Sequence, residues 1–87
     1  MVFTAYLRYR AGTRGFELEK IEESLRYGAE RYLDSETGRM VVIAKHHERL
    51  VVIPYEESDS TITPITVHGA SRRQITFRLD TGRYLPT

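Results

Sequence analysis

Two apolar, β-branched runs in the middle of the chain constrain its fold most. They are Met40–Ala44 (MVVIA) and Leu50–Ile53 (LVVI), and five residues separate them. Runs of this length and composition are typical of strands. The polar segment His46–Arg49 between them predicts an antiparallel hairpin with strands over Arg39–Lys45 and Leu50–Tyr55. Because both runs are nearly continuous, we expect the two faces of the sheet to be at least partly covered.

The residues before this hairpin predict two helices. In residues 3–14, apolar side chains recur every fourth position, at Phe3, Leu7 and Ala11, which favours a helix. A strand over Val2–Tyr9 is the alternative, because β-favouring residues are common there. Residues Phe16–Arg26 predict a second, amphipathic helix, with acidic residues early and Arg26 late, as the helix dipole prefers.

The remaining strands are predicted from shorter signals. Arg31–Leu33 is a short strand candidate, and Asp34–Gly38 (DSETG) is a turn. Glu56–Ser60 is expected to be a polar loop. Thr61–His68 is rich in β-branched residues and predicts a further strand. Pro64 lies within that strand, and a proline is tolerated at the edge of a sheet or at a bulge.

A short helix is predicted near the C-terminus. Ser71 followed by Gln74 matches a capping box, and Ile75 and Leu79 form an apolar pair one turn apart. Residues Asp80–Gly82 end this helix. The predicted fold is therefore a single α+β domain of residues 1–87, in which N-terminal helices pack on an antiparallel sheet of three to four strands and a short helix follows.

Composition excludes several classes of function. The chain has no cysteine, so thiol catalysis, disulfides and cysteine-based zinc sites are excluded. No apolar run reaches the roughly 20 residues of a membrane span, and the N-terminus has no continuous apolar region typical of a signal peptide. No phosphate-binding glycine loop, HExxH or GxSxG motif is present. We expect a cytoplasmic protein that needs no cofactor and no metal.

Basic residues gather at the two ends of the chain, although its net charge is only +1. From Gly69 onward there are four arginines and one acid. His68 directly precedes this stretch, at the predicted junction between strand and helix, and suits general acid–base catalysis near neutral pH. Arg72 and Arg73 could bind phosphate. Further candidates are Arg78, Arg83 and Tyr84 nearby, and Arg10 and Arg14 in the N-terminal segment.

Each of these residues also has an ordinary structural interpretation. His68 could simply hydrogen-bond the turn, and the arginines could form a solvated helix face. His46 and His47 are expected in a solvated hairpin tip, because adjacent strand residues point to opposite faces and no third metal ligand follows at a known spacing. With only His, Arg, Lys and Tyr available, metal-independent RNA cleavage is the catalysis that fits best.

The chain resembles a group of small uncharacterised prokaryotic proteins over nearly its full length. The residues concerned include YLRYRAGTRGFELEKIEESLRYGAERYLDSETGRMVVIAKH, LVVIPYEE and RRQITFRLDTGRY. In element order it also resembles BrnT and other RelE-like toxins of toxin–antitoxin modules. Ile65–Gln74 (ITVHGASRRQ) lies where BrnT-like sequences have a segment similar to ISARxAT. RelE-like toxins are usually strongly basic, and this chain departs from that pattern.

The resemblance implies an mRNA interferase, ribosome-dependent or free, that an antitoxin protein neutralises. By position it implies functional roles for His68, Arg72 and Arg73, with Tyr84 as a neighbouring catalytic candidate. A second hypothesis is a non-catalytic interaction module, forming a homodimer or binding a partner through the sheet edge near Pro64 and exposed tyrosines. A sequence-specific DNA-binding protein is a third, and no helix-turn-helix pattern supports it.

Overall fold

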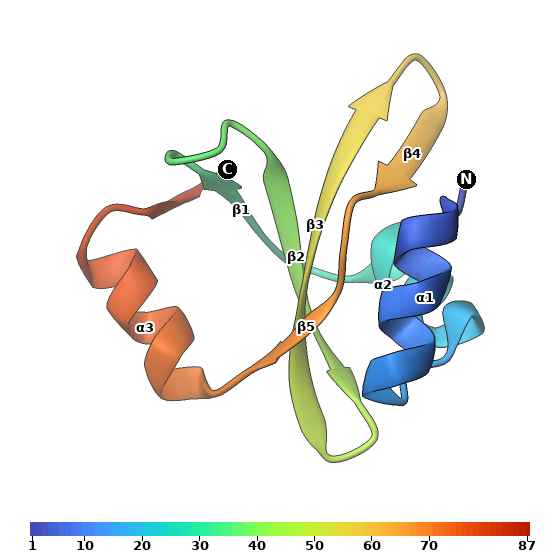
Figure 1. The fold of residues 1–87 in the computed structure, drawn as a ribbon. Helices are drawn as coiled ribbons and strands as arrows, with labels where there is room; N and C mark the ends of the chain where they lie inside the picture. Colours follow the sequence, from blue (N-terminus) through green and yellow to red (C-terminus); the bar gives the residue numbers. More distant parts are fainter.

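The computed structural model describes all 87 residues and contains three helices and a six-stranded antiparallel sheet (Figure 1). In chain order the elements are α1 (Ala5–Arg14), α2 (Leu18–Tyr27), β1 (Glu30–Asp34), β2 (Met40–His46), β3 (Arg49–Ser58), β4 (Thr61–Pro64), β5 (His68–Ala70), α3 (Arg72–Asp80) and β6 (Tyr84–Pro86). The α+β class is confirmed. The sheet is larger than predicted, because two three-residue strands join it.

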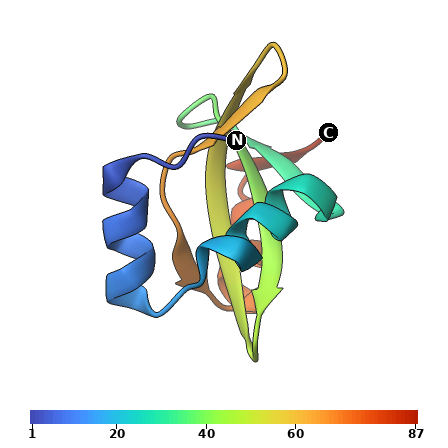
Figure 2. The same cartoon turned by 90° about the vertical axis from the view of Figure 1, so that its right-hand side faces the viewer.

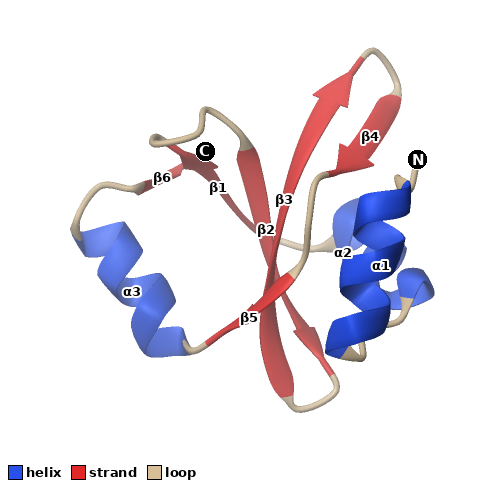
Figure 3. Cartoon of the chain, in the orientation of Figure 1, coloured by secondary structure: helices blue, strands red, loops and turns tan.

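The β2–β3 hairpin is the centre of the sheet, as its apolar runs predicted. Val42 pairs with Ile53, and the strands remain in register from Met40–Tyr55 to His46–Arg49. The strand order is β4-β3-β2-β1-β6, and β5 pairs with the first half of β3. The short strands β4 and β6 are therefore the two outer strands of this order (Figure 3).

Helices cover both faces of the sheet (Figures 1 and 2). Alternate residues of β2 and β3 point to opposite faces. One face packs against α1 and α2 in a core of ten buried residues that includes Leu7, Ile21 and Val42. The other face packs against α3 in a smaller core with Val52 and Ile75. The expectation that both faces are covered is confirmed.

The predicted helices are present, and local signals explain their ends. The first is a helix and not a strand: the Thr4 side chain accepts a hydrogen bond from the Leu7 amide, and Gly15 ends the helix with a φ of 75°. A residue with that φ is most easily a glycine. The capping box of α3 is present, since the side chains of Ser71 and Gln74 each accept a hydrogen bond from the other residue's backbone amide.

Two boundary predictions are wrong. The expected loop Glu56–Ser60 is mostly strand, because β3 continues to Ser58 and turns at Asp59, which has a φ of 54°. The residues after Tyr55 are polar because the β3–β4 hairpin extends past the core, where both of its faces meet water. The expected strand Thr61–His68 is interrupted after Pro64, and a new strand begins at His68.

The C-terminal residues form strand β6, which pairs with β1 and was not predicted. None of the three helices combines the length and the apolar character that crossing a membrane would require.

Candidate functional site

His68 lies on the α3 face of the sheet. It pairs with Val52 across the antiparallel β3–β5 ladder, and side chains of such a pair point to the same face. Val52 belongs to the core that α3 covers, together with Ile75. The imidazole of His68 is partly exposed. The strand pairing therefore places His68 on the α3 face of the sheet, partly open to solvent.

Four arginines act on this histidine by charge repulsion. The pKa of His68 is lowered first by burial and then by repulsion from Arg78, Arg14, Arg10 and Arg83, in that order. These residues come from α1, from α3 and from the loop before β6. We call the five residues the His68 cluster. Because the ordinary pKa of 6.5 is lowered, His68 is neutral at pH 7 and can accept a proton.

Carboxylates compensate only one of the four arginines. The Arg83 guanidinium lies 3.3 Å from the buried carboxylate of Asp34 and 3.5 Å from that of Glu36. Arg10, Arg14 and Arg78 take part in no ion pair. Three uncompensated cations beside a neutral imidazole form a local positive field on a chain of low net charge, and such a field attracts anions.

One arginine of the cluster has a buried nitrogen without a hydrogen-bond partner. The Arg10 Nε and the Thr66 Oγ1 are the two buried side-chain polar atoms without a hydrogen-bond partner. Thr66 precedes His68 by two residues. A buried donor without an acceptor costs about 1–3 kcal/mol.

Tyr84 positions an arginine of the cluster. It is 2 % exposed, and its hydroxyl accepts a hydrogen bond of 2.8 Å from Arg78 Nη1. The guanidinium carbons of Arg78 and Arg83 lie 5.5 and 6.0 Å from the centre of its ring. On the far side the ring stacks on Tyr32. This burial leaves Tyr84 little room to touch a substrate, and it acts as a support for Arg78.

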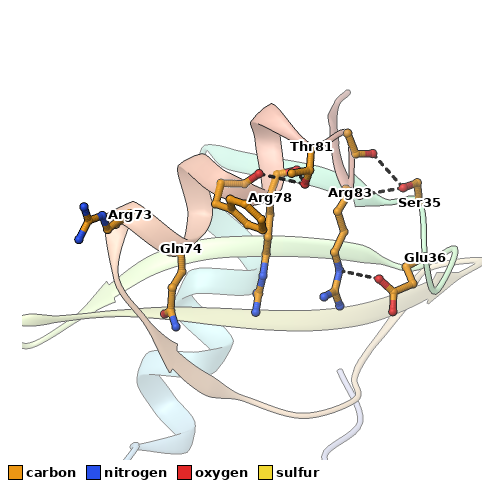
Figure 4. Close-up of a pocket in the computed structure, with 9 residues that line it drawn as sticks. Ser35, Glu36, Arg73, Gln74, Arg78, Thr81 and Arg83 are labelled. Carbon is orange, nitrogen blue, oxygen red and sulfur yellow. Dashed lines mark hydrogen bonds and ion pairs between the residues drawn. The ribbon is translucent and has the colours of Figure 1, made fainter.

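Arg72 and Arg73 are not part of the His68 cluster. Arg72 forms a two-point ion pair with Glu30, at 2.7 and 3.0 Å, and this contact lowers the pKa of Glu30. Arg73 is exposed, and in Figure 4 it points away from Arg78 and Arg83, whose side chains extend in a common direction. The arginines whose charges act on His68 are therefore the four predicted phosphate-binding candidates Arg10, Arg14, Arg78 and Arg83, and not Arg72 and Arg73.

A shallow pocket lies beside the cluster, between α3 and the turn after β1 (Figure 4). Its lining includes Phe77, Arg78, Arg83 and Ser35. The Ser35 hydroxyl donates to backbone oxygens of Gly82 and Arg83, which ties the β1 turn to the end of α3. This contact and the Asp34–Arg83 pair hold the C-terminal arginines in place.

The prediction of a solvated histidine pair at the hairpin tip is wrong for His46, which is 3 % exposed. Its ring packs edge-on against Phe16, and its Nε2 accepts a 3.4 Å hydrogen bond from the Glu17 amide. Glu17 also supplies the third potential metal ligand that the sequence did not reveal, since ligand atoms of Glu17, His46 and His47 lie within 4.8 Å of one another.

The surroundings of this second cluster do not favour a cation. The pKa of His46 is lowered mainly by burial and also by the positive charges of His47, Lys20 and Arg49. Glu17 is also the N-cap of α2, and a helix N-terminus carries partial positive charge. We therefore interpret the cluster as a junction that fastens the β2–β3 hairpin to α2.

Sequence reasoning missed Asp34, which pairs with Arg83 of the His68 cluster, and Thr66, whose hydroxyl is buried without a partner. No local pattern marks them. Asp34 lies 49 residues before its partner Arg83, and Thr66 is one of several β-branched residues in its segment. Comparisons with family models, curated proteins and solved structures found no match to this chain.

Proposed function

We propose that this chain is a toxin-like endoribonuclease of the RelE/BrnT type that cleaves mRNA without a metal ion. The observation that carries the proposal is the half-buried His68, whose neutral form is favoured by burial and by the charges of three arginines without carboxylate partners. A general base and several cations beside one exposed junction are what phosphodiester cleavage by a neighbouring hydroxyl requires. The resemblance in element order adds support to this interpretation.

In this mechanism His68 is the general base. Its neutral imidazole takes the proton of a ribose 2′-hydroxyl, and the 2′ oxygen then forms a bond to phosphorus. The bond from phosphorus to the 5′ oxygen breaks, and this oxygen takes a proton from the imidazolium or from solvent. The products are a 2′,3′-cyclic phosphate and a free 5′-hydroxyl. A positioned general base typically contributes about 10²–10⁴-fold to the rate.

The arginines bind and stabilise the reacting phosphate. Arg78 is the strongest charge acting on His68, and the Tyr84 hydroxyl holds it in place. Arg10 and Arg14 approach from α1. Cations fixed before the reaction stabilise the dianionic phosphorane more than the monoanionic phosphodiester, which lowers the barrier. Arg72 has no part in this proposal, because Glu30 occupies its guanidinium.

An antitoxin protein is the partner that this function implies. A protein that covered the His68 cluster with carboxylates would neutralise its three free arginines and exclude RNA. The alternative, a self-associating module that pairs through a sheet edge, has less support. The strands at the sheet edges, β4, β5 and β6, have only four, three and three residues. Short outer strands offer few backbone groups for pairing with another chain.

The proposal is tested by inducing the chain alone in a bacterial host and following growth and total RNA integrity. We expect growth arrest with loss of mRNA. His68→Gln should abolish both effects. His47→Gln is the matched control, because His47 is exposed and lies outside the cluster. Normal growth with intact mRNA, from folded wild-type protein, would shift the assignment to a non-catalytic interaction module.

A further inference from the structure

Two exposed tyrosines extend the His68 cluster along α1. Tyr6 is 55 % exposed and Tyr9 is 67 % exposed, so neither ring belongs to the core. The Arg10 guanidinium carbon lies 5.8 Å from the centre of the Tyr6 ring. Arg10 is also one of the arginines that repel a proton on His68. Arg10 therefore acts on His68 through its charge and lies beside an exposed aromatic ring.

The arrangement follows from helix geometry. At about 100° per residue, Arg14, Arg10, Tyr6 and Tyr9 follow one another around one flank of α1, from the edge of the buried stripe outward. The buried stripe itself is Leu7 and Ala11. Arg10 and Arg14 carry positive charge that acts on His68, and the exposed ring of Tyr6 lies beside Arg10 on this flank. A ligand bound at Arg10 therefore lies next to a tyrosine face.

We propose that Tyr6 and Tyr9 stack on the bases of a single-stranded RNA whose phosphates bind to Arg10 and Arg14. This inference rests on the proposed RNA-directed function and identifies the RNA bases as a part of the substrate that the protein binds. Aromatic side chains beside a row of cations are the usual means of binding single strands without reading their sequence. A double helix would not fit this role, because its bases are already stacked on one another.

Charge and exposure favour a nucleic acid over a protein partner. The tyrosines border arginines that lack carboxylate partners, and α1 carries no acidic residue. A polyanion with flat rings matches both halves of this surface. Tyr27 is an exposed tyrosine in different surroundings. It is 79 % exposed, but it lies at the end of α2 near the acids Glu19, Glu22 and Glu23.

The test compares two fluorescein-labelled twelve-residue probes by fluorescence anisotropy. One is 2′-O-methyl oligouridylate, which cannot be cleaved because its 2′ oxygens are blocked. The other has the same number of phosphates and no bases. Wild-type protein should bind the base-containing probe more tightly. The Tyr6→Leu/Tyr9→Leu variant should lose about fivefold or more of that affinity per tyrosine. Its affinity for the abasic probe should stay close to wild type.

Tyr27→Leu is the matched control and should bind both probes like wild type. Leucine keeps helix propensity and apolar area, so circular dichroism should show that the double variant is folded. If wild type binds both probes equally and the double variant changes nothing, the stacking inference is wrong, whereas phosphate binding at the cluster stands. If wild type binds neither probe in the absence or presence of ribosomes, the stacking inference and the proposed function both fail.

Discussion

Replacing Asp34 by alanine should destabilise the protein more than any other change at the basic end of the sheet. Asp34 is 3 % exposed, and its carboxylate accepts hydrogen bonds from the Glu36 amide at 2.9 Å and the Thr37 amide at 3.4 Å. Arg83 donates two more, at 3.4 and 3.3 Å. Alanine removes the carboxylate that accepts these hydrogen bonds and leaves Arg83 with only the exposed Glu36.

The magnitude follows from these contacts. Each hydrogen bond from a backbone amide to the Asp34 carboxylate contributes about 1 kcal/mol to stability. The ion pair with Arg83 adds about 1 kcal/mol more, a low figure because its contacts are long and the arginine side chain is 35 % exposed. Asp34→Ala should therefore lower the free energy of unfolding by about 3 kcal/mol. A domain of this size has a total of about 4–13 kcal/mol.

The assay is urea unfolding followed by far-ultraviolet circular dichroism, since the chain has no tryptophan. Asp34→Asn keeps an oxygen for the two amides and should lose only about 1 kcal/mol. Glu36→Ala is the control, and it should change the free energy of unfolding by less than about 0.5 kcal/mol. A loss below about 1 kcal/mol for Asp34→Ala would refute the reasoning. Arg83 would then be free to bind phosphate.

Three further predictions test the cluster and the packing. The pKa of His68 is lower in the folded chain than its ordinary value of 6.5. The contribution of His68 to stability is therefore complete above pH 6.5 and is lost as the pH falls through the folded pKa. His68→Gln should reduce the drop in unfolding free energy between pH 7 and pH 5. Equal drops would contradict this. Gly28→Ala should cost about 1–3 kcal/mol, because its Cβ would lie 2.5 Å from a backbone oxygen of α2 and 2.7 Å from Val42. Gly12 lies inside α1, and a Cβ added there would have no neighbouring atom within 4 Å. Gly12→Ala should therefore raise the melting temperature, whereas Gly28→Ala should lower it, and thermal unfolding of the two variants checks this difference. Ser71→Ala should cost about 1 kcal/mol in urea unfolding by removing the cap of α3, and an unchanged midpoint would show that the cap is unimportant.

Elements with local signals were predictable from the sequence. The capping pair Ser71 and Gln74 lies within one turn of helix, and the β2–β3 hairpin joins neighbouring segments. Strands β5 and β6 have three residues each, too few for any periodic pattern to show. Their pairing depends on where β3 and β1 already lie. A sequence window cannot contain that information.

The residue types of the site were predictable from the sequence, but which of the candidate arginines belong to it was less so. His68, Arg10, Arg14 and Arg78 were all candidates, yet whether α1 reaches His68 depends on packing between residues more than 50 positions apart. The ion pair of Arg72 could not be predicted, because Glu30, 42 residues earlier, lies opposite it only in the folded chain. Long-range pairing decides which arginine is free and which is neutralised.

Cleavage of an mRNA by the purified protein, with and without ribosomes and in the presence of a metal chelator, tests the central claim most directly. The account predicts fragments that end in a 2′,3′-cyclic phosphate and begin with a 5′-hydroxyl. It also predicts that His68→Gln slows their formation by about 10²-fold or more, whereas His47→Gln does not. Cleavage that is unchanged in His68→Gln, or intact RNA under both conditions with folded wild-type protein, would contradict it.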